Sequence, residues 1–408
     1  MSFQSGRVSF CRFAVSGDAP ASISQELLDQ LSANAYTDSS IGAPGEIESG
    51  WITGDHLYDT QFTFDKNAFG NLLLFAMRVD RNRIPAEVRY AYQRAHEQAV
   101  AAGNPSGFLS RAQKKEVRDL VDRQVHDELA TGKHRRSKQV DLVWDLANGQ
   151  LYCAASGNKI HEALSAGFRG TFDLDLEMLT AGALAGAVLQ GKGQLRDYED
   201  LHPSPFTPPP SDRHRDQDEA AQSPQDASIP NVPWAHTSTD AKDFLGNEWL
   251  IWLWWLSEMG DATVEAQVAG QKRSLSFTLV QALDMECAWG YRGKQGLREA
   301  APTRMSEAAE GLKNGKWPRK TGLILADGES QWELSLQADR LLVSAALLPE
   351  ITDTASPRDL VEQRLLRSRE LAQSLDGLYE TFLRQRTSSA WDGTRQNIRD
   401  WIGKRRRK

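Results

Sequence analysis

Apolar residues recur at two spacings along the chain, one typical of strands and one typical of helices. Residues 7–15 alternate as a strand, residues 71–79 form an apolar strand, and residues 24–33 carry leucines at helical spacing. Asn148-Gly149 and Asp327-Gly328 each separate two short extended runs, as expected of hairpin turns that need positive φ. Because strands and helices follow no regular βαβ alternation, the pattern predicts an α+β fold with antiparallel sheets and packed helices.

The longest apolar run extends from Trp249 to Leu256 and holds four of the twelve tryptophans. A helix that is apolar on every side is buried, and this one has Asp243 as an expected N-cap and Gly260 as an expected C-cap. The run is far shorter than the ~20 residues that cross a bilayer. Exposed tryptophans could stack on bases, but these lie among Leu and Ile, which favours core packing.

A second helix is expected to begin at Ser110, which forms a capping box with Gln113. Its buried stripe repeats every four residues, at Val117, Val121, Val125 and Leu129. Residues 110–138 hold nine Lys/Arg and five Asp/Glu, a balance of 9 − 5 = +4. Such a helix could hold DNA phosphates, or it could be a solvated face with pairs such as Lys115–Asp119. Composition does not decide between the two.

Positive charge is concentrated, although the net charge of −7 argues against a nucleic-acid binder. Residues 384–408 hold nine Lys/Arg and two Asp, a balance of 9 − 2 = +7, so the rest of the chain carries −7 − 7 = −14. Lys313, Lys316, Arg319 and Lys320 form a further cluster without an intervening acid. These segments could contact phosphates, or they could be a polar hairpin entrance and a solubilising tail.

Proline marks a break in the chain, because residues 203–233 hold eight of its sixteen prolines. Such a segment buries too little apolar surface to order itself, so we expect a disordered linker or insertion. The expected organisation is an α+β domain over 1–195, a linker over 196–242, and a second α+β domain over 243–350. A long helix with a basic tail, 351–408, follows, and its cap is Ser356 with Pro357 at the first helical position.

Three cysteines, Cys11, Cys153 and Cys287, are far apart and match no metal-ligand spacing, which suggests buried side chains in a reducing compartment. With no signal-like or membrane-spanning segment, a cytoplasmic protein is expected.

Two motifs could belong to an enzyme. The run Gly186–Gly193 has the glycine spacing of a phosphate-binding loop, but Gly193 replaces the required Ser/Thr and the preceding residues do not resemble a strand. Asp173, Asp175 and Glu177 alternate on an expected strand over 171–176 and could hold the metal of a nuclease. No nearby Lys or His completes that site, so an exposed strand face explains them better. We expect no catalytic residue, metal site or cofactor.

Several separated motifs occur in an order that resembles the RdgC-type recombination-associated proteins, over roughly Arg7 to Pro349. They are Gly50-Trp51, Arg83-Ile84-Pro85, Leu109-Ser110 with Gln113-Lys114-Lys115-Glu116, Val143-Trp144-Asp145 with Asn148-Gly149-x-Leu151, Phe168-Arg169-x-Thr171-Phe172, the segment Phe244–Leu250 with Trp252-Leu253-Trp254, Leu312-Lys313-x-x-Lys316, Trp332-x-Leu334-x-Leu336 and Leu347-x-Pro349. The proline-rich insertion and the basic tail depart from compact members of that family. The resemblance implies a homodimeric ring that surrounds double-stranded DNA in the nucleoid. It also implies that the ring occludes DNA from a strand-exchange recombinase of the RecA type.

The expected function is therefore sequence-independent binding of duplex DNA that modulates homologous recombination, without catalysis. The residues expected to contact DNA are basic side chains of the two clusters: Arg111, Lys114, Lys115, Arg118, Lys133, Arg135, Arg136, Lys138, Lys313, Lys316, Arg319 and Lys320. Two alternatives stay open, a metal-dependent nuclease and a scaffold that binds proteins through residues 203–233.

Overall fold

The computed structural model describes residues 3–37, 47–210, 229–260, 262–290, 293–352 and 355–405. The fold is α+β with extensive antiparallel strand pairing, as the sequence predicts. The chain forms two compact units. Unit 1 comprises Met1–Val15, Gln150–Ser156 and Glu177–Lys408, and unit 2 comprises Ser16–Gly149 and Gly157–Leu176. The domain boundaries drawn from the sequence remain a prediction.

Unit 2 is built on the strands β5 (Arg135–Asp145), β4 (Leu72–Asn82) and β2 (Ile47–Ile52), in that order, with β3 (Ala68–Phe69) beside β4. Helix α5 (Asn158–Phe172) packs against this sheet, where the rings of Trp144 and Phe168 lie 5.0 Å apart. A Cβ at Gly167 would lie 3.3 Å from Trp51, so the glycine allows the helix a close approach to β2. Helix α1 (Gln25–Ala33) packs on α5, and the short α2 (Phe64–Asn67) contacts β4.

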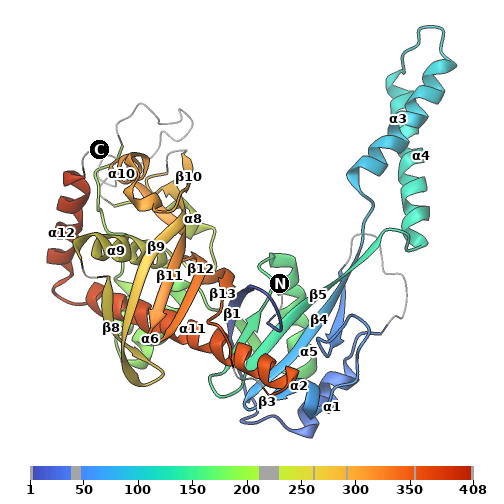
Figure 1. Cartoon of the computed structure of the whole chain (residues 1–408). Helices are drawn as coiled ribbons and strands as arrows, with labels where there is room; N and C mark the ends of the chain where they lie inside the picture. The colour runs from blue at the N-terminus through green and yellow to red at the C-terminus, as the bar shows by residue number, and fades with distance from the viewer. Residues whose placement is uncertain are drawn as a thin grey trace. The chain divides into compact units, whose positions relative to one another are not determined.

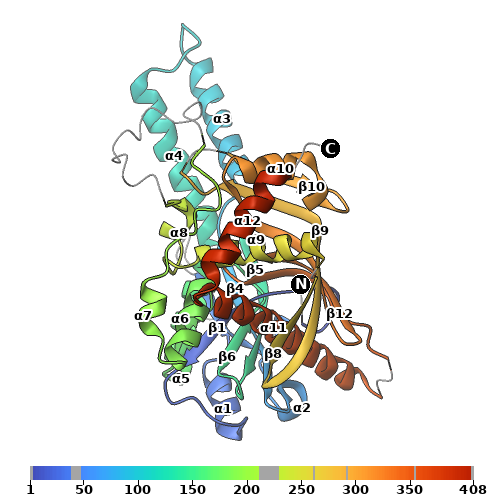
Figure 2. The same ribbon diagram turned by 90° about the vertical axis from the view of Figure 1, so that its left-hand side faces the viewer.

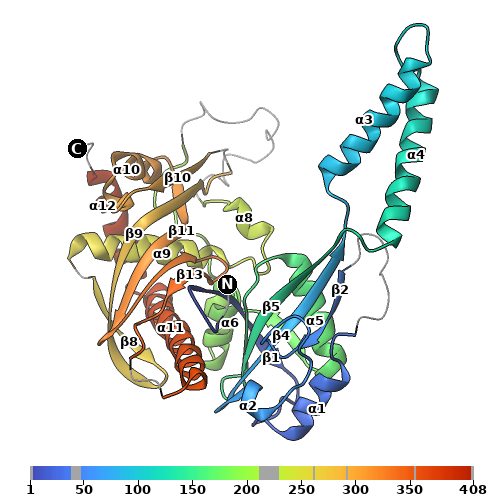
Figure 3. The ribbon, with the colours of Figure 1, turned by 45° about the vertical axis from the view of Figure 1, so that its right-hand side comes forward.

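Between β4 and β5 the chain forms a helical hairpin, α3 (Ala86–Ala102) and α4 (Arg111–Ala130), that extends from the ends of these two strands (Figure 3). The expected capping box of Ser110 and Gln113 is present, and the buried stripe of α4 is confirmed. That stripe forms a small core of its own with Ile84, against which Val88, Tyr92, Val100 and Leu109 pack. The hairpin is therefore held by few contacts beyond its own.

Unit 1 contains a sheet in the order β10-β9-β11-β12-β13-β1-β6, with β8 beside β9. The strands are β1 (Val8–Ser16), β6 (Gln150–Cys153), β8 (Thr263–Val268), β9 (Gln271–Cys287), β10 (Lys294–Arg298), β11 (Lys316–Asp327), β12 (Ser330–Gln337) and β13 (Leu342–Leu347). The expected hairpins around Gly270 and Asp327-Gly328 are confirmed, and both glycines have positive φ. Helix α11 (Pro357–Arg386) packs along β8 (Figure 1).

The tryptophan-rich segment forms helix α9 (Phe244–Met259), whose residues from Phe244 to Trp254 are all buried, as predicted. Gly260 ends it at φ +95°, but the expected cap at Asp243 is wrong, because its side chain makes no cap bond to α9. Asp243 instead accepts a hydrogen bond from the Gly182 amide of α6 (Ala181–Gly191), at 2.9 Å. The tryptophans pack in the core, where Trp249 lies 5.2 Å from the ring of Tyr379. Among the described residues, no helix is long and apolar enough to span a membrane.

The C-terminal region differs from the sequence expectation. The cap at Ser356 and the helix α11 are confirmed, but the expected basic tail contains a second helix, α12 (Trp391–Lys404), which lies beside α9 (Figure 2). Trp391, Ile398 and Trp401 are buried on one side of α12, and their three- to seven-residue spacing was obscured by the surrounding charges. The Arg405 guanidinium lies over the rings of both Trp254 and Trp401, at 4.5 and 4.8 Å from their centroids.

Two further expectations are corrected. The first residues of the proline-rich segment are ordered, since Phe206 packs against Trp317 and the Ser204 amide donates to Glu248 at 2.5 Å. Residues 211–228 of that segment lie outside the described residues. The expected strand over 171–176 is also wrong, because α5 continues to Phe172 and β7 spans only Asp175–Met178. The remaining helices are α7 (Leu195–Glu199), α8 (Pro233–His236), the 3₁₀ helix η3 (Pro302–Arg304) and α10 (Ser306–Lys313).

Candidate nucleic-acid interface

Cationic side chains gather where β4 and β5 lead into the helical hairpin of unit 2. In the antiparallel register Arg81 lies opposite Arg136, and Val79 lies opposite Lys138, so Arg81, Arg136 and Lys138 belong to one face of the sheet. With Arg83 they line a cavity of about 440 Å³, and no Asp or Glu is among the described residues of its wall. We call this cavity, lined by Arg81, Arg83, Arg136 and Lys138, the basic pocket.

The four cations of the basic pocket are exposed, and none forms an ion pair with any residue that the structure describes. Because like charges placed opposite each other on neighbouring strands repel, the Arg81–Arg136 pair opposes folding rather than favouring it. Features that break a local rule in this way often belong to functional sites. The charge of the basic pocket therefore favours the binding of an anion.

His134 also borders the basic pocket, and its Nε2 lies 3.2 Å from Glu128 Oε2. Glu128 is engaged elsewhere, because Lys133 Nζ donates to it at 2.6 Å and the Tyr92 hydroxyl donates at 2.8 Å. Hydrogen bonds from Lys133, Tyr92 and His134 lower the pKa of Glu128 to about 2. This carboxylate is thus ionised at neutral pH and belongs to the base of the hairpin.

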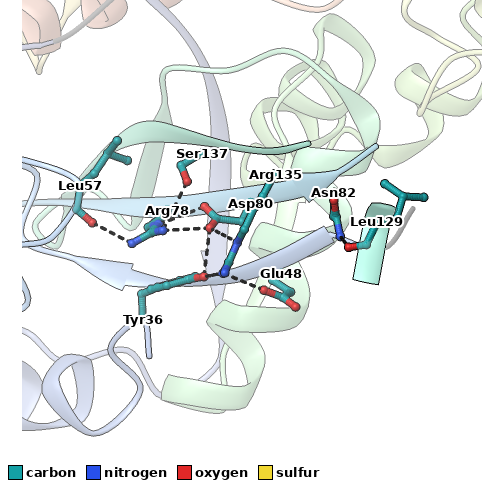
Figure 4. Close-up of polar contacts among 9 residues, drawn as sticks. All are labelled: Tyr36, Glu48, Leu57, Arg78, Asp80, Asn82, Leu129, Arg135 and Ser137. Atoms are coloured by element: carbon teal, nitrogen blue, oxygen red, sulfur yellow. Dashed lines mark hydrogen bonds and ion pairs between the residues drawn. The ribbon is translucent and has the colours of Figure 1, made fainter. Parts of the chain in front are cut away.

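The opposite face of the same strand ends is electrically balanced (Figure 4). Asp80 Oδ2 accepts hydrogen bonds from Arg78 at 2.9 Å and Tyr36 at 3.1 Å, and lies 2.7 Å from Arg135 Nε. Arg135 also contacts Glu48 at 3.0 Å and donates to the Tyr36 hydroxyl. We call Tyr36, Glu48, Arg78, Asp80 and Arg135 the ion network.

Burial within the ion network would by itself raise the pKa of Asp80, but hydrogen bonds from Arg78 and Ser137 and the charge of Arg78 hold it below its usual value. Burial and the nearby carboxylate of Asp80 raise the pKa of Tyr36. The guanidinium of Arg78 lies over two rings, 4.1 Å from the centroid of Tyr36 and 5.2 Å from that of Tyr58. Arg78 and Arg135 are therefore structural cations, with their charges matched inside the protein.

The expected DNA-binding residues of the hairpin fall into separate sets. Arg111, Lys114, Lys115 and Arg118 occupy the first two turns of α4, are exposed, and form no ion pair within the described ranges. We call these four residues the tip set. Because the tip set occupies the first two turns of α4, its members lie about 18–29 Å from the C-terminal end of that helix, at 1.5 Å per residue. Lys133 is paired with Glu128, and Arg135 belongs to the ion network.

The second expected cluster lies in unit 1, where the fold supplies acids and acceptors that the sequence spacing does not reveal. Arg319 contacts Glu286 at 2.8 Å and Asp339 at 2.6 Å, and Lys316 donates to Gln295 at 3.1 Å. Lys313 donates to the backbone carbonyl of Arg405. Lys320 forms no ion pair with a described residue, and it lines a smaller cavity whose wall also holds Asp284 and Glu286. Within the described residues, Arg319 is thus the member of this cluster that is paired with acids, whereas Lys313 and Lys316 bind uncharged oxygens.

The residues considered for catalysis do not form a constellation in unit 2. Asp173 is the left-handed C-cap of α5, at φ +56°, and Asp175 is paired with Arg169. The phosphate-loop spacing at Gly186–Gly193 falls mostly within helix α6, which bears out the rejection of that motif. The three cysteines are buried, as expected.

Two residues of the basic pocket, Arg81 and Arg83, were not among the expected DNA-binding residues. The signal that could have found them is register. If residues 71–79 are paired with the strand before Asn148-Gly149, the extension of both strands brings Arg81 opposite Arg136. Sequence spacing alone gives no such pairing, because the hairpin of α3 and α4 separates the two strands by some fifty residues along the chain.

No protein-family model matches the chain, and no curated protein matches it either.

Proposed function

We propose that the protein binds double-stranded DNA without sequence specificity and modulates homologous recombination by keeping a RecA-type recombinase from that DNA. The observation that supports this proposal is the basic pocket, in which four cations converge with neither an ion-pair partner nor a facing acid among the described residues. Unpaired cations gain affinity for DNA by releasing the counterions condensed on its phosphates, and this gain is independent of sequence. The motif resemblance to RdgC-type proteins supports occlusion by a nucleoid-associated homodimeric ring, without catalysis.

The tip set supports the same proposal. Along α4, the tip set lies about 18–29 Å from the base of the hairpin, which is less than one helical turn of DNA, ≈ 34–36 Å. A duplex running along the hairpin could therefore bring phosphates within one turn to both the basic pocket and the tip set. Both sets consist of Lys and Arg, and contacts from such side chains to phosphates carry no sequence information directly. Non-specific binding with a steep salt dependence is the expected behaviour.

The proposal is tested by a salt series of affinity for one linear duplex. The wild type is compared with Arg136→Glu/Lys138→Glu in the basic pocket and Lys114→Glu/Arg118→Glu in the tip set. Each lost phosphate contact should reduce the slope of log K against log salt by about 0.9, so each double variant should lose close to two contacts. The matched control is Lys272→Glu/Arg298→Glu, which changes the charge equally at exposed residues already paired with Glu265 and Asp284.

Unchanged slopes in both double variants, or the same reduction in the control, would contradict phosphate holding by these sites. Absence of binding at about 50 mM salt would end the DNA proposal altogether. Occlusion is then tested by strand exchange with a RecA-type recombinase. Inhibition should rise with wild-type protein and should weaken in the two variants in proportion to their lost affinity. Sedimentation of the protein with and without DNA tests the homodimer.

A further inference from the structure

The basic pocket has a second property besides its charge, which is an apolar wall. Val79, Ile84 and Ile160 line it together with Pro85 and Ala86, and the first three of these are buried. A cavity of about 440 Å³ with apolar walls and a few charged groups matches small-molecule sites, which span ≈ 300–1,000 Å³. A surface that serves only to attract internal phosphates of a duplex needs no such cavity.

The charge of the basic pocket suits a phosphomonoester better than an internal phosphodiester. A diester in the backbone carries one charge and is tethered on both sides, so on the convex surface of a duplex it presents only one side to a protein. A phosphomonoester carries about −1.5 to −2 at neutral pH and three acceptor oxygens, and it is tethered on one side only. It can therefore enter a cavity, where the forked guanidinium groups of Arg81, Arg83 and Arg136 can each bind two of its oxygens.

A bound dianion would also relieve the repulsion between Arg81 and Arg136, which lie opposite each other in the strand register. We infer that the basic pocket binds one nucleotide through its phosphomonoester, with the sugar and base against the apolar wall formed by Val79, Ile84 and Ile160. This inference rests on the proposed function in taking the phosphorylated ligand to be a nucleotide. The nucleotide is either free in solution or the terminal residue of a DNA strand.

The first experiment is a calorimetric titration of the full chain with dAMP. We expect a dissociation constant below about 1 mM, and at least tenfold weaker binding by Arg81→Gln/Arg136→Gln. The tip-set variant Lys114→Gln/Arg118→Gln, which removes the same charge outside the cavity, should bind dAMP as the wild type does. Both pairs of side chains are exposed and form no ion pair with described residues, so the variants should fold, and circular dichroism checks this.

Titrations with deoxyadenosine and with inorganic phosphate separate the contribution of the apolar wall from that of the cations. Deoxyadenosine should bind far more weakly than dAMP, because it lacks the anion, and inorganic phosphate should bind at least fivefold more weakly, because it lacks the apolar part. Inorganic phosphate that binds as tightly as dAMP would overturn the inference and reduce the basic pocket to an anion site. No dAMP binding at millimolar concentration would overturn it as well.

The source of the nucleotide is decided by competition against two duplexes of equal length, one linear with 5′-phosphates and one closed at both ends by hairpin loops. If dAMP displaces only the linear duplex, the pocket takes terminal nucleotides. If it displaces both, the free nucleotide competes with internal phosphates. If neither duplex binds, the proposed function is wrong. If both duplexes bind but dAMP does not, only the inference of a nucleotide site is wrong.

Discussion

The two faces of the sheet, where β4 and β5 lead into the helical hairpin, both carry arginines but differ in how those arginines are paired. On one face lies the ion network. Asp80 contacts Arg135, Arg78 and Tyr36 at 2.7, 2.9 and 3.1 Å, and Glu48 contacts Arg135 at 3.0 Å. On the other face, the described residues of the basic pocket include four cations and no acid.

The neighbours Arg135 and Arg136 carry the same charge and differ only in the face of β5 to which they belong. The alternation of side chains between the two faces of a strand, rather than the number of charges nearby, therefore separates cations that stabilise the fold from cations that can bind a ligand.

Removing Asp80 from the ion network should destabilise unit 2 more than any other substitution considered. Asp80→Ala removes the carboxylate that faces both Arg78 and Arg135 and leaves two guanidinium groups without their main partner. Asp80 is only 2% exposed, so the uncompensated charges would destabilise unit 2 by about 3–5 kcal/mol. Urea unfolding, with hydrogen exchange of the β4 and β5 amides to locate the change, measures this.

Glu48→Ala serves as the control for that change. Glu48 contacts Arg135 from a side chain that is 30% exposed, so its removal should destabilise by less than about 1 kcal/mol. Equal effects of the two substitutions would mean that the ion network does not centre on Asp80.

The balanced face should also make unit 2 sensitive to acid. The pKa of Asp80 in the folded protein lies below its usual value, so its contribution to stability is complete above the unfolded pKa of about 3.9. That contribution is lost as the pH falls below this value and through the folded pKa. We expect unfolding midpoints of the wild type to drop in this acidic range and those of Asp80→Asn to drop less. Parallel pH profiles for the two proteins would exclude Asp80 as the titrating group.

A smaller effect is expected at the junction between the sheet and the hairpin. Asn82 is buried, and its side-chain amide donates to the Leu129 carbonyl at 2.7 Å, which ties the last turn of α4 to the end of β4. Asn82→Ala should weaken that connection by about 1–3 kcal/mol. The amides of the last turn of α4 should then exchange faster, while those in the middle of β4 stay protected. Asn104→Ala, at the far end of the hairpin, should leave the last turn unchanged.

Local patterns in the sequence predict much of this fold. The capping box at Ser110, the stripe from Val117 to Leu129, the Asp327-Gly328 turn and the buried tryptophan helix all depend on residues close in sequence, and all are present. The failures have a common cause in longer-range packing. The sequence analysis missed helix α12 because charged residues surround its few apolar positions. Its buried side packs on partners such as Trp254, which is distant in the sequence.

The candidate site was predicted only in part for the same reason. Arg136 and Lys138 were expected, but Arg81 and Arg83 become their neighbours only through the pairing of β4 with β5. Arg135 and Arg319 were expected to contact DNA, yet each is paired with an acid in the fold, Arg135 with Asp80 and Arg319 with Asp339. Sequence composition locates positive charge, whereas strand register decides which of it is neutralised.

The smallest expected effect gives the sharpest test of the contrast between the two faces. Arg136→Gln removes one cation from a like-charged pair, so it should stabilise unit 2 by about 0.2–1 kcal/mol. In the proposed function it should also lower the salt slope of DNA binding by about 0.9, which corresponds to one phosphate contact. The adjacent substitution Arg135→Gln should act in the opposite way, lowering stability through the ion network and leaving the salt slope unchanged. If both substitutions changed stability in the same direction and the slope by the same amount, the two faces would be equivalent and the strand alternation would not separate folding from binding.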